Sequence, residues 1–232
     1  MRDTIYFISD QHLGREKNED KKIEKLFSFF DYIAPTASAL YIVGDFFDFY
    51  FEYKTQIPKK YYEVFRRLSC LTEKHVQVHY FTGNHDFWLG RFFESIGISV
   101  HKSSERVLLQ GKRVYIAHGS EMISFDPMNL VLRNRVAIAL FYLLHPDLAY
   151  KIASFVSRIS RMNSKKKTIR WRKLYDIAGK ILQGDIDAVI LGHIHIPIHR
   201  KLDGKDFILL GDWVKYFSYA VMRKGKLSLY YW

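Results

Sequence analysis

Cysteine is almost missing from this sequence, and so is any apolar segment long enough to cross a membrane. Cys70 is the single cysteine in 232 residues, so the chain can form neither an internal disulfide nor a thiolate metal site. The apolar run at 136–144 is far shorter than the roughly 20 residues that a membrane-spanning helix needs. The first residues, Met1-Arg2-Asp3, lead directly into a predicted strand, which argues against a signal peptide. We therefore expect a cytosolic protein.

Low-complexity tracts, long glycine and serine linkers and internal repeats are also absent. Without a linker nothing divides the chain, and 232 residues suit one large domain that spans 1–232. The hydrophobic fraction of 48% is ordinary for a globular protein, so disorder is not expected.

Acidic residues are scarce relative to basic ones, and the imbalance is concentrated in one segment. The formal net charge is +12. Residues 126–180 contain twelve Lys or Arg but three Asp, which accounts for +9 of this total. Such a segment favours partners that carry phosphate or lie on an anionic membrane. The alternative is an ordinary solvated basic face on helices whose apolar side packs in the core.

Apolar periodicity predicts an α/β fold with a helical segment in its second half. Residues at helical spacing predict helices at 18–32 and 58–74, and the pattern is helical throughout 127–182. Strands alternate with helices at first and follow one another at the end, which is typical of an α/β sandwich with ligands beyond the strand ends. The predicted strands are 4–9, 39–43, 76–81, 106–109, 113–117, 188–191, 198–202, 207–210, 219–223 and 226–231.

Five of the predicted strands end in residues that bind metal ions or carry protons. Each motif alone is weak, because an Asp or His after a strand is more often a capping or packing residue. Together they supply seven oxygen and imidazole donors, a set that suits Mn, Fe or Zn and exceeds the coordination of one ion. Two ions that share a bridging carboxylate would use all of them. These residues are Asp10, His12, Asp45, Asn84, His118, His193 and His195.

The same motifs resemble the signature blocks of the calcineurin-like metallophosphoesterases. The blocks Asp-x-His, Gly-Asp-x-x-Asp, Gly-Asn-His-Asp, His-Gly and Gly-His-x-His occur in this order between Asp10 and His195. The resemblance implies a four-layer α/β/β/α sandwich with a helical insertion, at about 126–183, that forms a lid. It also implies two metal sites that share Asp45. The first would use Asp10, His12, Asp45 and His195, and the second Asp45, Asn84, His118 and His193.

For such a site the resemblance implies phosphoester hydrolysis by two divalent ions, with Mn²⁺ as the leading candidate and Fe, Zn or Mg as alternatives. Two ions about 3.5 to 4 Å apart clamp phosphoryl oxygens and lower the pKa of a bridging water. His85 would act beside the leaving oxygen as a proton donor or electrostatic stabiliser, and Asp86 would orient its ring. Asp48 either caps the loop around Asp45 or takes a direct part.

The helical insertion lies between the His118 block and the Gly-His-x-His block. This position is similar to that in the UDP-diacylglucosamine hydrolases, which are peripheral membrane enzymes of lipid A synthesis. The stretches 39–45 and 161–165, and Leu210-Gly211 before Trp213, add to this likeness. It implies cleavage of UDP-2,3-diacylglucosamine into UMP and lipid X, which is 2,3-diacylglucosamine 1-phosphate. The implied substrate contacts are Asn84, His85, Asp126, Ser164, Thr168, Arg170, Arg172 and His193.

Two positions depart from that family. Many of its members have Arg at the position of His85 and an acidic residue at the position of Ser120. The chain therefore matches a divergent branch of the lipid enzymes.

The insertion also suits a lipid-linked nucleotide diphosphate on physical grounds. Apolar helix faces can shelter acyl chains, while Lys and Arg can meet both the diphosphate and an anionic membrane. We expect a cytoplasmic enzyme that associates peripherally with the inner-membrane surface.

Two other functions use the same metal donors. A nuclease or nucleotide phosphodiesterase would lay a polyanionic backbone along the basic segment, but aromatic residues for base stacking are few there, so no stable nucleic-acid partner is expected. A non-catalytic protein that uses the same fold to bind a partner would be expected to lack some metal donors, whereas all seven are present in this sequence.

Overall fold

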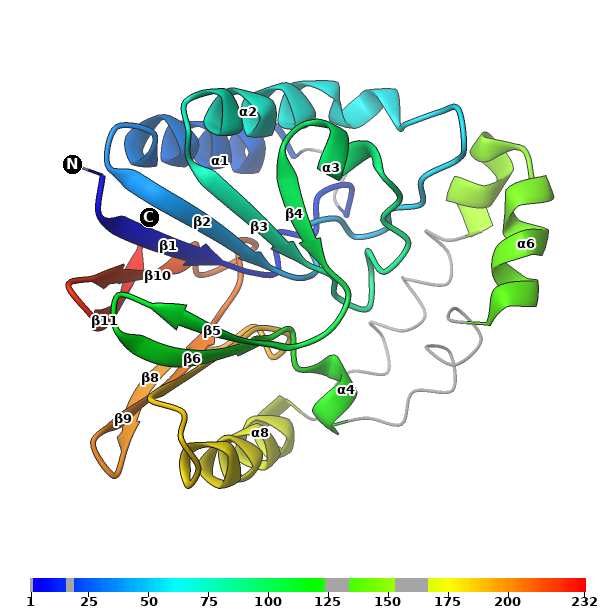
Figure 1. The fold of residues 1–232 in the computed structure, drawn as a ribbon. Coiled ribbons are helices and arrows are strands. Elements are labelled where there is room, and N and C mark those ends of the chain that lie inside the picture. Colours follow the sequence, from blue (N-terminus) through cyan, green and yellow to red (C-terminus); the bar gives the residue numbers. More distant parts are fainter. Residues whose placement is uncertain (1, 16–18, 124–133, 153–166) are drawn as a thin grey trace.

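Two β-sheets pack face to face in the centre of the molecule (Figure 1). The computed structural model describes residues 2–15, 19–123, 134–152 and 167–232. In this part of the chain the first sheet has the strand order β11-β10-β1-β2-β3-β4 and the second the order β5-β6-β7-β9-β8. The strands are β1 (Thr4–Ile8), β2 (Ala37–Val43), β3 (Gln77–Phe81), β4 (Ile98–His101), β5 (Glu105–Leu109), β6 (Lys112–Ala117), β7 (Ala188–Leu191), β8 (Pro197–Leu202), β9 (Lys205–Leu210), β10 (Ser218–Arg223) and β11 (Lys226–Tyr231).

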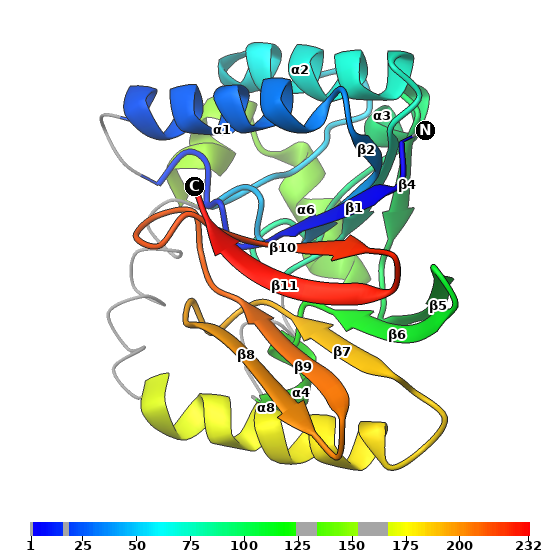
Figure 2. The same cartoon turned by 90° about the vertical axis from the view of Figure 1, so that its left-hand side faces the viewer.

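Helices cover the outer face of each sheet (Figure 2). Two long helices, α1 and α2, pack on the first sheet, and α8 packs on the second. The predicted four-layer α/β/β/α sandwich is therefore confirmed. The helices are α1 (Asp20–Ile33), the 3₁₀ turn η1 (Lys59–Tyr61), α2 (Tyr62–Glu73), α3 (Phe92–Ser95), α4 (Ser120–Ile123), α6 (Arg135–Leu143) and α8 (Lys167–Leu182).

Strand β1 illustrates how the sequence fits between these layers. All five of its residues are buried, as expected of a strand that is covered on both faces. Side chains alternate along a strand, so Tyr6 and Ile8 pack with the outer helices, whereas Ile5 and Phe7 pack between the sheets. Phe7 stacks on Tyr41 of β2 with ring centroids 5.1 Å apart. Burial of such a side chain stabilises the fold by roughly 1.5–3 kcal/mol.

Parallel pairing brings the carboxyl ends of several strands to one edge of the sandwich. In the first sheet β1, β2 and β3 pair in parallel, and in the second sheet β6, β7 and β9 do so. The loops that follow these strands carry the motifs found in the sequence. The topology therefore gathers residues that lie up to 185 positions apart, such as Asp10 and His195.

Most predicted elements are confirmed, and one strand was missed. The hairpin turn between β5 and β6 has positive φ at both Gln110 (47°) and Gly111 (79°), as a two-residue hairpin turn requires. Strand β4 was not predicted, because four residues with mixed polarity at the sheet edge carry little periodic signal. Its pairing with β3, which sets Val78 beside Ile98, makes it a strand.

The described parts of the range 126–183 are helical but have two different environments. Leu174, Ala178 and Leu182 of α8 are buried with residues of β7 and β9, so this end of the range is a layer of the sandwich. By contrast, α6 packs beside the aromatic loop after β2, where Phe51 and Phe141 have ring centroids 4.8 Å apart. Among the described helices, none combines the length and hydrophobicity needed to cross a bilayer.

Candidate active site

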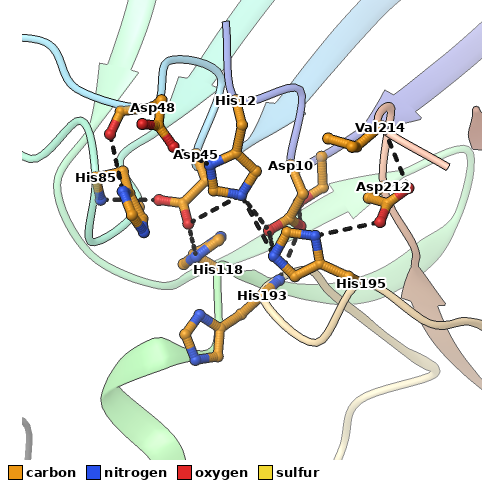
Figure 3. Close-up of polar contacts among 12 residues, drawn as sticks. Asp10, His12, Asp45, Asp48, His85, His118, His193, His195, Asp212 and Val214 are labelled. Carbon is orange, nitrogen blue, oxygen red and sulfur yellow. Dashed lines mark hydrogen bonds and ion pairs between the residues drawn. The ribbon is translucent and has the colours of Figure 1, made fainter. Parts of the chain in front are cut away.

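The loops after β1, β2, β3, β6 and β7 bring the predicted metal donors together at the edge where the two sheets meet (Figure 3). Donor atoms of Asp10, His12 and His195 lie within 4.8 Å of one another, and so do those of Asp45, His118 and His193. A third group joins His12, Asp45 and His85 within the same distance. The structure thus places six of the seven predicted donors, all but Asn84, in two adjoining clusters.

The two carboxylate oxygens of Asp10 make different kinds of contact. Oδ2 accepts hydrogen bonds from the Ser9 hydroxyl (2.5 Å) and from the backbone N–H of His193 (2.9 Å). Oδ1 faces His12 Nε2 at 3.6 Å and His195 Nε2 at 3.5 Å. One oxygen therefore fixes the side chain, and the other is presented to the first cluster.

Asp45 follows the same design and lies between the clusters. Its Oδ1 accepts the backbone N–H of His85 at 2.9 Å. Its Oδ2 is 3.2 Å from His118 Nε2 and 3.8 Å from His12 Nε2. This oxygen is the one that two ions could share.

Buried polar atoms without hydrogen-bond partners test whether metal ions fit this site. Nine buried side-chain atoms of the described residues have no such partner, and Asp10 Oδ1, Asn84 Oδ1 and His118 Nε2 are among them. Unsatisfied buried polar atoms are rare in native proteins and need an explanation. All three belong to predicted metal donors, and their oxygen and imidazole chemistry suits divalent ions. The residues therefore fit a pair of metal ions.

Most of the imidazole rings are held by a second group. His118 Nδ1 lies 3.0 Å from the carbonyl oxygen of Val43, and His85 Nδ1 lies 2.8 Å from that of Asp48. His195 Nδ1 is 3.3 Å from a carboxylate oxygen of Asp212. Partners of this kind fix ring orientation and tautomer at metal sites.

The backbone of the site is unusual where it carries the donors. Five non-glycine donors have positive φ, a conformation that collects at functional sites and costs on the order of 1–3 kcal/mol per residue. Gly44 also has positive φ (79°), and a Cβ there would approach the His118 ring to 2.4 Å. A side chain at this position would displace a donor. The five donors are Asp10, His12, Asp45, His193 and His195.

The two carboxylates make the site strongly attractive to cations. Burial acts to lower the pKa of His12 and His118, but the carboxylates of Asp10 and Asp45 outweigh it and raise these pKa values to about 9 and about 10. Burial and the charge of His118 lower the pKa of His193 to about 3, which leaves that ring neutral. Protons thus occupy His12 and His118 where metal ions would otherwise bind.

The structure corrects the task predicted for Asp86. We predicted that this carboxylate orients the ring of His85, but the ring nitrogen of His85 is held by the Asp48 carbonyl instead. Asp86 is fully buried and accepts hydrogen bonds from the Tyr80 hydroxyl (2.5 Å) and the backbone N–H groups of Gly83 (2.7 Å) and Phe46 (2.7 Å). Asp86 therefore joins the loops after β2 and β3.

Asp48 contacts two rings of the site and links two of its loops, as the capping alternative predicts, and a direct part in the chemistry stays a prediction. Its carbonyl contacts His85 as described, and its carboxylate oxygen Oδ1 lies 3.6 Å from His12 Nδ1. Its backbone N–H also donates to the carbonyl of Leu13 (2.9 Å), which links the loops after β1 and β2.

The predicted substrate contacts divide by location. His85 and His193 lie in the donor groups, Asn84 is the buried residue just before His85, and Arg172 is exposed on α8. Asp126 and Ser164 lie outside the described residues, and Thr168 and Arg170 fall in the part of α8 where only the backbone is described. Their roles stay predictions.

Sequence reasoning missed two residues that support the donors, Ser9 and Asp212. Ser9 donates to Asp10, and its position inside a predicted strand gave no signal. Asp212 follows β9 in the sequence Leu210-Gly211-Asp212, which repeats the arrangement of Val43-Gly44-Asp45 after β2. That repetition was a usable signal.

An α/β/β/α sandwich with two adjoining clusters of oxygen and imidazole donors defines a metal-dependent phosphoesterase. The sequence comparisons agree, because the model of the calcineurin-like phosphoesterase family matches residues 4–197. The chain belongs to this family.

Curated relatives match along nearly the whole chain, and a solved structure shares the fold. A UDP-2,3-diacylglucosamine hydrolase of Porphyromonas gingivalis is 33% identical over 95% of this chain and 94% of the relative. One of Histophilus somni is 31% identical over 90% and 91%. A solved archaeal phosphodiesterase shares the fold with a TM-score of 0.53, at 14% identity and 99% coverage of both chains.

Metal binding should release protons. Ligand imidazoles must be neutral, and the raised pKa values of His12 and His118 mean that both carry a proton in the metal-free protein at pH 7.5. We expect release of about two protons per protein when two Mn²⁺ ions bind. Calorimetric titrations in buffers with different ionisation enthalpies measure this number. The apparent affinity should also rise with pH between 6.5 and 8, and binding heats that do not depend on the buffer would contradict the prediction.

Proposed function

We propose that the protein hydrolyses the diphosphate of UDP-2,3-diacylglucosamine and releases UMP and 2,3-diacylglucosamine 1-phosphate. The observation that carries this proposal is the similarity to curated relatives with that name along 95% of the chain, at 33% identity. The matched length includes the insertion as well as the metal donors. This matters because the donors are suited to phosphoesters in general, whereas the insertion is the part that can select the substrate.

Two divalent ions, Mn²⁺ as the leading candidate, would be held by the two donor clusters. When bound, they supply Lewis-acid activation of water and neutralise charge on the diphosphate. The protein's own part is to present the free oxygens of Asp10 and Asp45 and to keep the rings in place through fixed partners. Asp10, His12, Asp45 and His195 would hold one ion, and Asp45, Asn84, His118 and His193 the other.

His85 is proposed to act at the leaving oxygen. Its Nδ1 is tied to the Asp48 carbonyl (2.8 Å), so Nδ1 donates there and Nε2 is the nitrogen that exchanges a proton with substrate. The ring lies against His12, edge to face with centroids 4.9 Å apart, and a nitrogen of the ring is within 4.8 Å of an Asp45 carboxylate oxygen. The ring is thus fixed beside the donor clusters, with Nε2 left to face the substrate as a proton donor.

The insertion is proposed to receive the lipid part of the substrate. Phe141 of α6 packs against Phe51 and Trp88, with ring centroids 4.8 Å and 5.4 Å apart, and the hydroxyl of Tyr53 donates to the carbonyl of Leu144 (3.2 Å). These contacts anchor α6 to the loops after β2 and β3, which also carry Asp45 and His85. Aromatic surface beside the site is suited to acyl chains.

The outer side of α6 is proposed to bind the inner-membrane surface from the cytoplasm. Val136, Leu140 and Leu143 follow helical spacing on one face and are 67%, 60% and 83% exposed. Together with the excess of Lys and Arg in this segment, an exposed apolar face is typical of a helix that lies in a membrane interface.

A turnover assay tests the proposed substrate. Purified protein with Mn²⁺ should release UMP from UDP-2,3-diacylglucosamine dispersed in detergent, and Asp45→Asn should abolish the release, because both clusters share this carboxylate. Chromatographic quantification of UMP gives the rate. Cleavage of DNA or of a cyclic nucleotide at comparable kcat/KM would favour the nuclease or phosphodiesterase alternative instead.

Substitution of His85 tests its proposed role. His85→Ala should lower kcat by about 10²- to 10⁴-fold, the usual contribution of general acid catalysis, while the metal content measured by mass spectrometry stays as in the wild type. His199→Ala is a matched control, because this histidine lies on β8, pairs with Asp206 and belongs to none of the donor groups. A wild-type rate in His85→Ala would remove the proposed role.

Vesicle binding tests the membrane proposal. A double variant with Leu140→Asp and Leu143→Asp should bind vesicles of phosphatidylglycerol and phosphatidylethanolamine at least about tenfold more weakly, since two apolar side chains leave the interface and two anions enter it. Leu108→Asp on β5, which is 72% exposed, is the matched control. Equal sedimentation of the double variant and the wild type with vesicles would refute the proposal.

A further inference from the structure

Asp212 is a buried carboxylate beside the site that neither the sequence motifs nor the proposed chemistry uses. It follows β9, whose carboxyl end lies next to that of the parallel strand β7, and it is 5% exposed. The next residue, Trp213, donates its backbone N–H to the carbonyl of Asp10 (3.1 Å). The turn is thereby fixed to the loop that carries the first donor.

The two oxygens of Asp212 have separate partners (Figure 3). Oδ1 accepts the backbone N–H groups of Val214 (3.2 Å), Lys215 (2.7 Å) and Tyr216 (3.0 Å), which closes the turn after β9. Oδ2 lies 3.3 Å from Nδ1 of His195. Because three N–H donors hold Oδ1, the turn fixes the orientation of the carboxylate independently of its contact with His195.

This arrangement selects one tautomer of His195. An ionised carboxylate only accepts hydrogen bonds, so in the neutral ring Nδ1 carries the proton and Nε2 keeps a free lone pair. Nε2 is the nitrogen that faces the first cluster, 3.5 Å from Asp10 Oδ1 and 3.3 Å from His12 Nε2.

We propose that Asp212 is a positioning residue of the metal centre, which holds His195 in the tautomer whose Nε2 can bind a metal ion. The proposal rests on the proposed metal sites and deepens them. It concerns the chain's own geometry and does not depend on which phosphoester is the substrate.

Two substitutions separate positioning from a merely structural role. In Asp212→Asn the amide oxygen must stay on the three N–H groups of the turn, because an amide nitrogen cannot accept hydrogen bonds. The NH₂ group then faces His195 Nδ1 and donates to it, which moves the ring proton to Nε2 and blocks metal binding there. Asp212→Ala loses the turn contacts as well. The asparagine variant therefore keeps the fold and loses the positioning.

Titration of the metal-free proteins with Mn²⁺, followed by electron paramagnetic resonance of the free ion, measures the effect. The wild type should bind two ions, and in Asp212→Asn one of the two sites should weaken by about 10- to 100-fold, as expected for loss of a partner behind a histidine ligand. Asp206→Asn is the matched control: it alters the other Asp–His pair of these strands, Asp206 with His199 at 2.7 Å, and should bind both ions normally.

The possible outcomes separate the inference from the proposed function. Failure of the wild type to bind two ions would overturn the metal sites themselves. Two ions bound equally well by the wild type and Asp212→Asn would overturn the role of Asp212 alone. A second measurement needs no variant of Asp212: in Zn²⁺-loaded protein labelled with ¹⁵N-histidine, the His195 ring should carry its proton on Nδ1, and an unprotonated Nδ1 would also overturn the inference.

Discussion

Two buried carboxylates, those of Asp10 and Asp45, impose the constraint on which the rest of the site depends. Neither is more than 1% exposed, and buried anions are costly unless they are paired. One oxygen of each is satisfied by donors from the protein, while the other faces imidazoles of the two clusters. The site is therefore built to attract positive charge. Protons on His12 and His118 can supply that charge, because the pKa values of both rings are raised, and under the proposed function metal ions supply it.

Holding these carboxylates in place requires a backbone that short loops do not adopt on their own. Donor residues with positive φ store strain, and Asp86 counters it by accepting hydrogen bonds from both the loop after β2 and the loop after β3. The apolar cores between the sheets and beneath the helices supply the stability on which this strained edge depends. The metal donors are thus confined to one edge of the sandwich. There the strands end, and backbone N–H groups that no longer pair within a sheet can donate to side chains.

The sandwich and the insertion have different parts in the proposed function. The sandwich presents the metal donors, an arrangement that serves phosphoester hydrolysis in general. The contacts of Phe141 with Phe51 and Trp88 place α6 against the loops that position Asp45 and His85, so binding of a lipid by the insertion would be coupled to the geometry of the site. Asp212 has a comparable effect on a donor of the first cluster, because the turn after β9 holds Asp212 and thereby sets the orientation of His195.

The sequence by itself determined the layers and the donors, because both follow from local patterns. Buried strands read as apolar runs, and each run ends in a donor that parallel pairing must carry to the same edge. The tertiary structure alone decided what those donors touch. Strand β4 exists because it pairs with β3. Asp86 holds Phe46 and not the ring beside it in sequence, and Asp212 meets His195 across two neighbouring strands. Such contacts join residues far apart along the chain, and their geometry depends on the packing of two sheets, which no local spacing encodes.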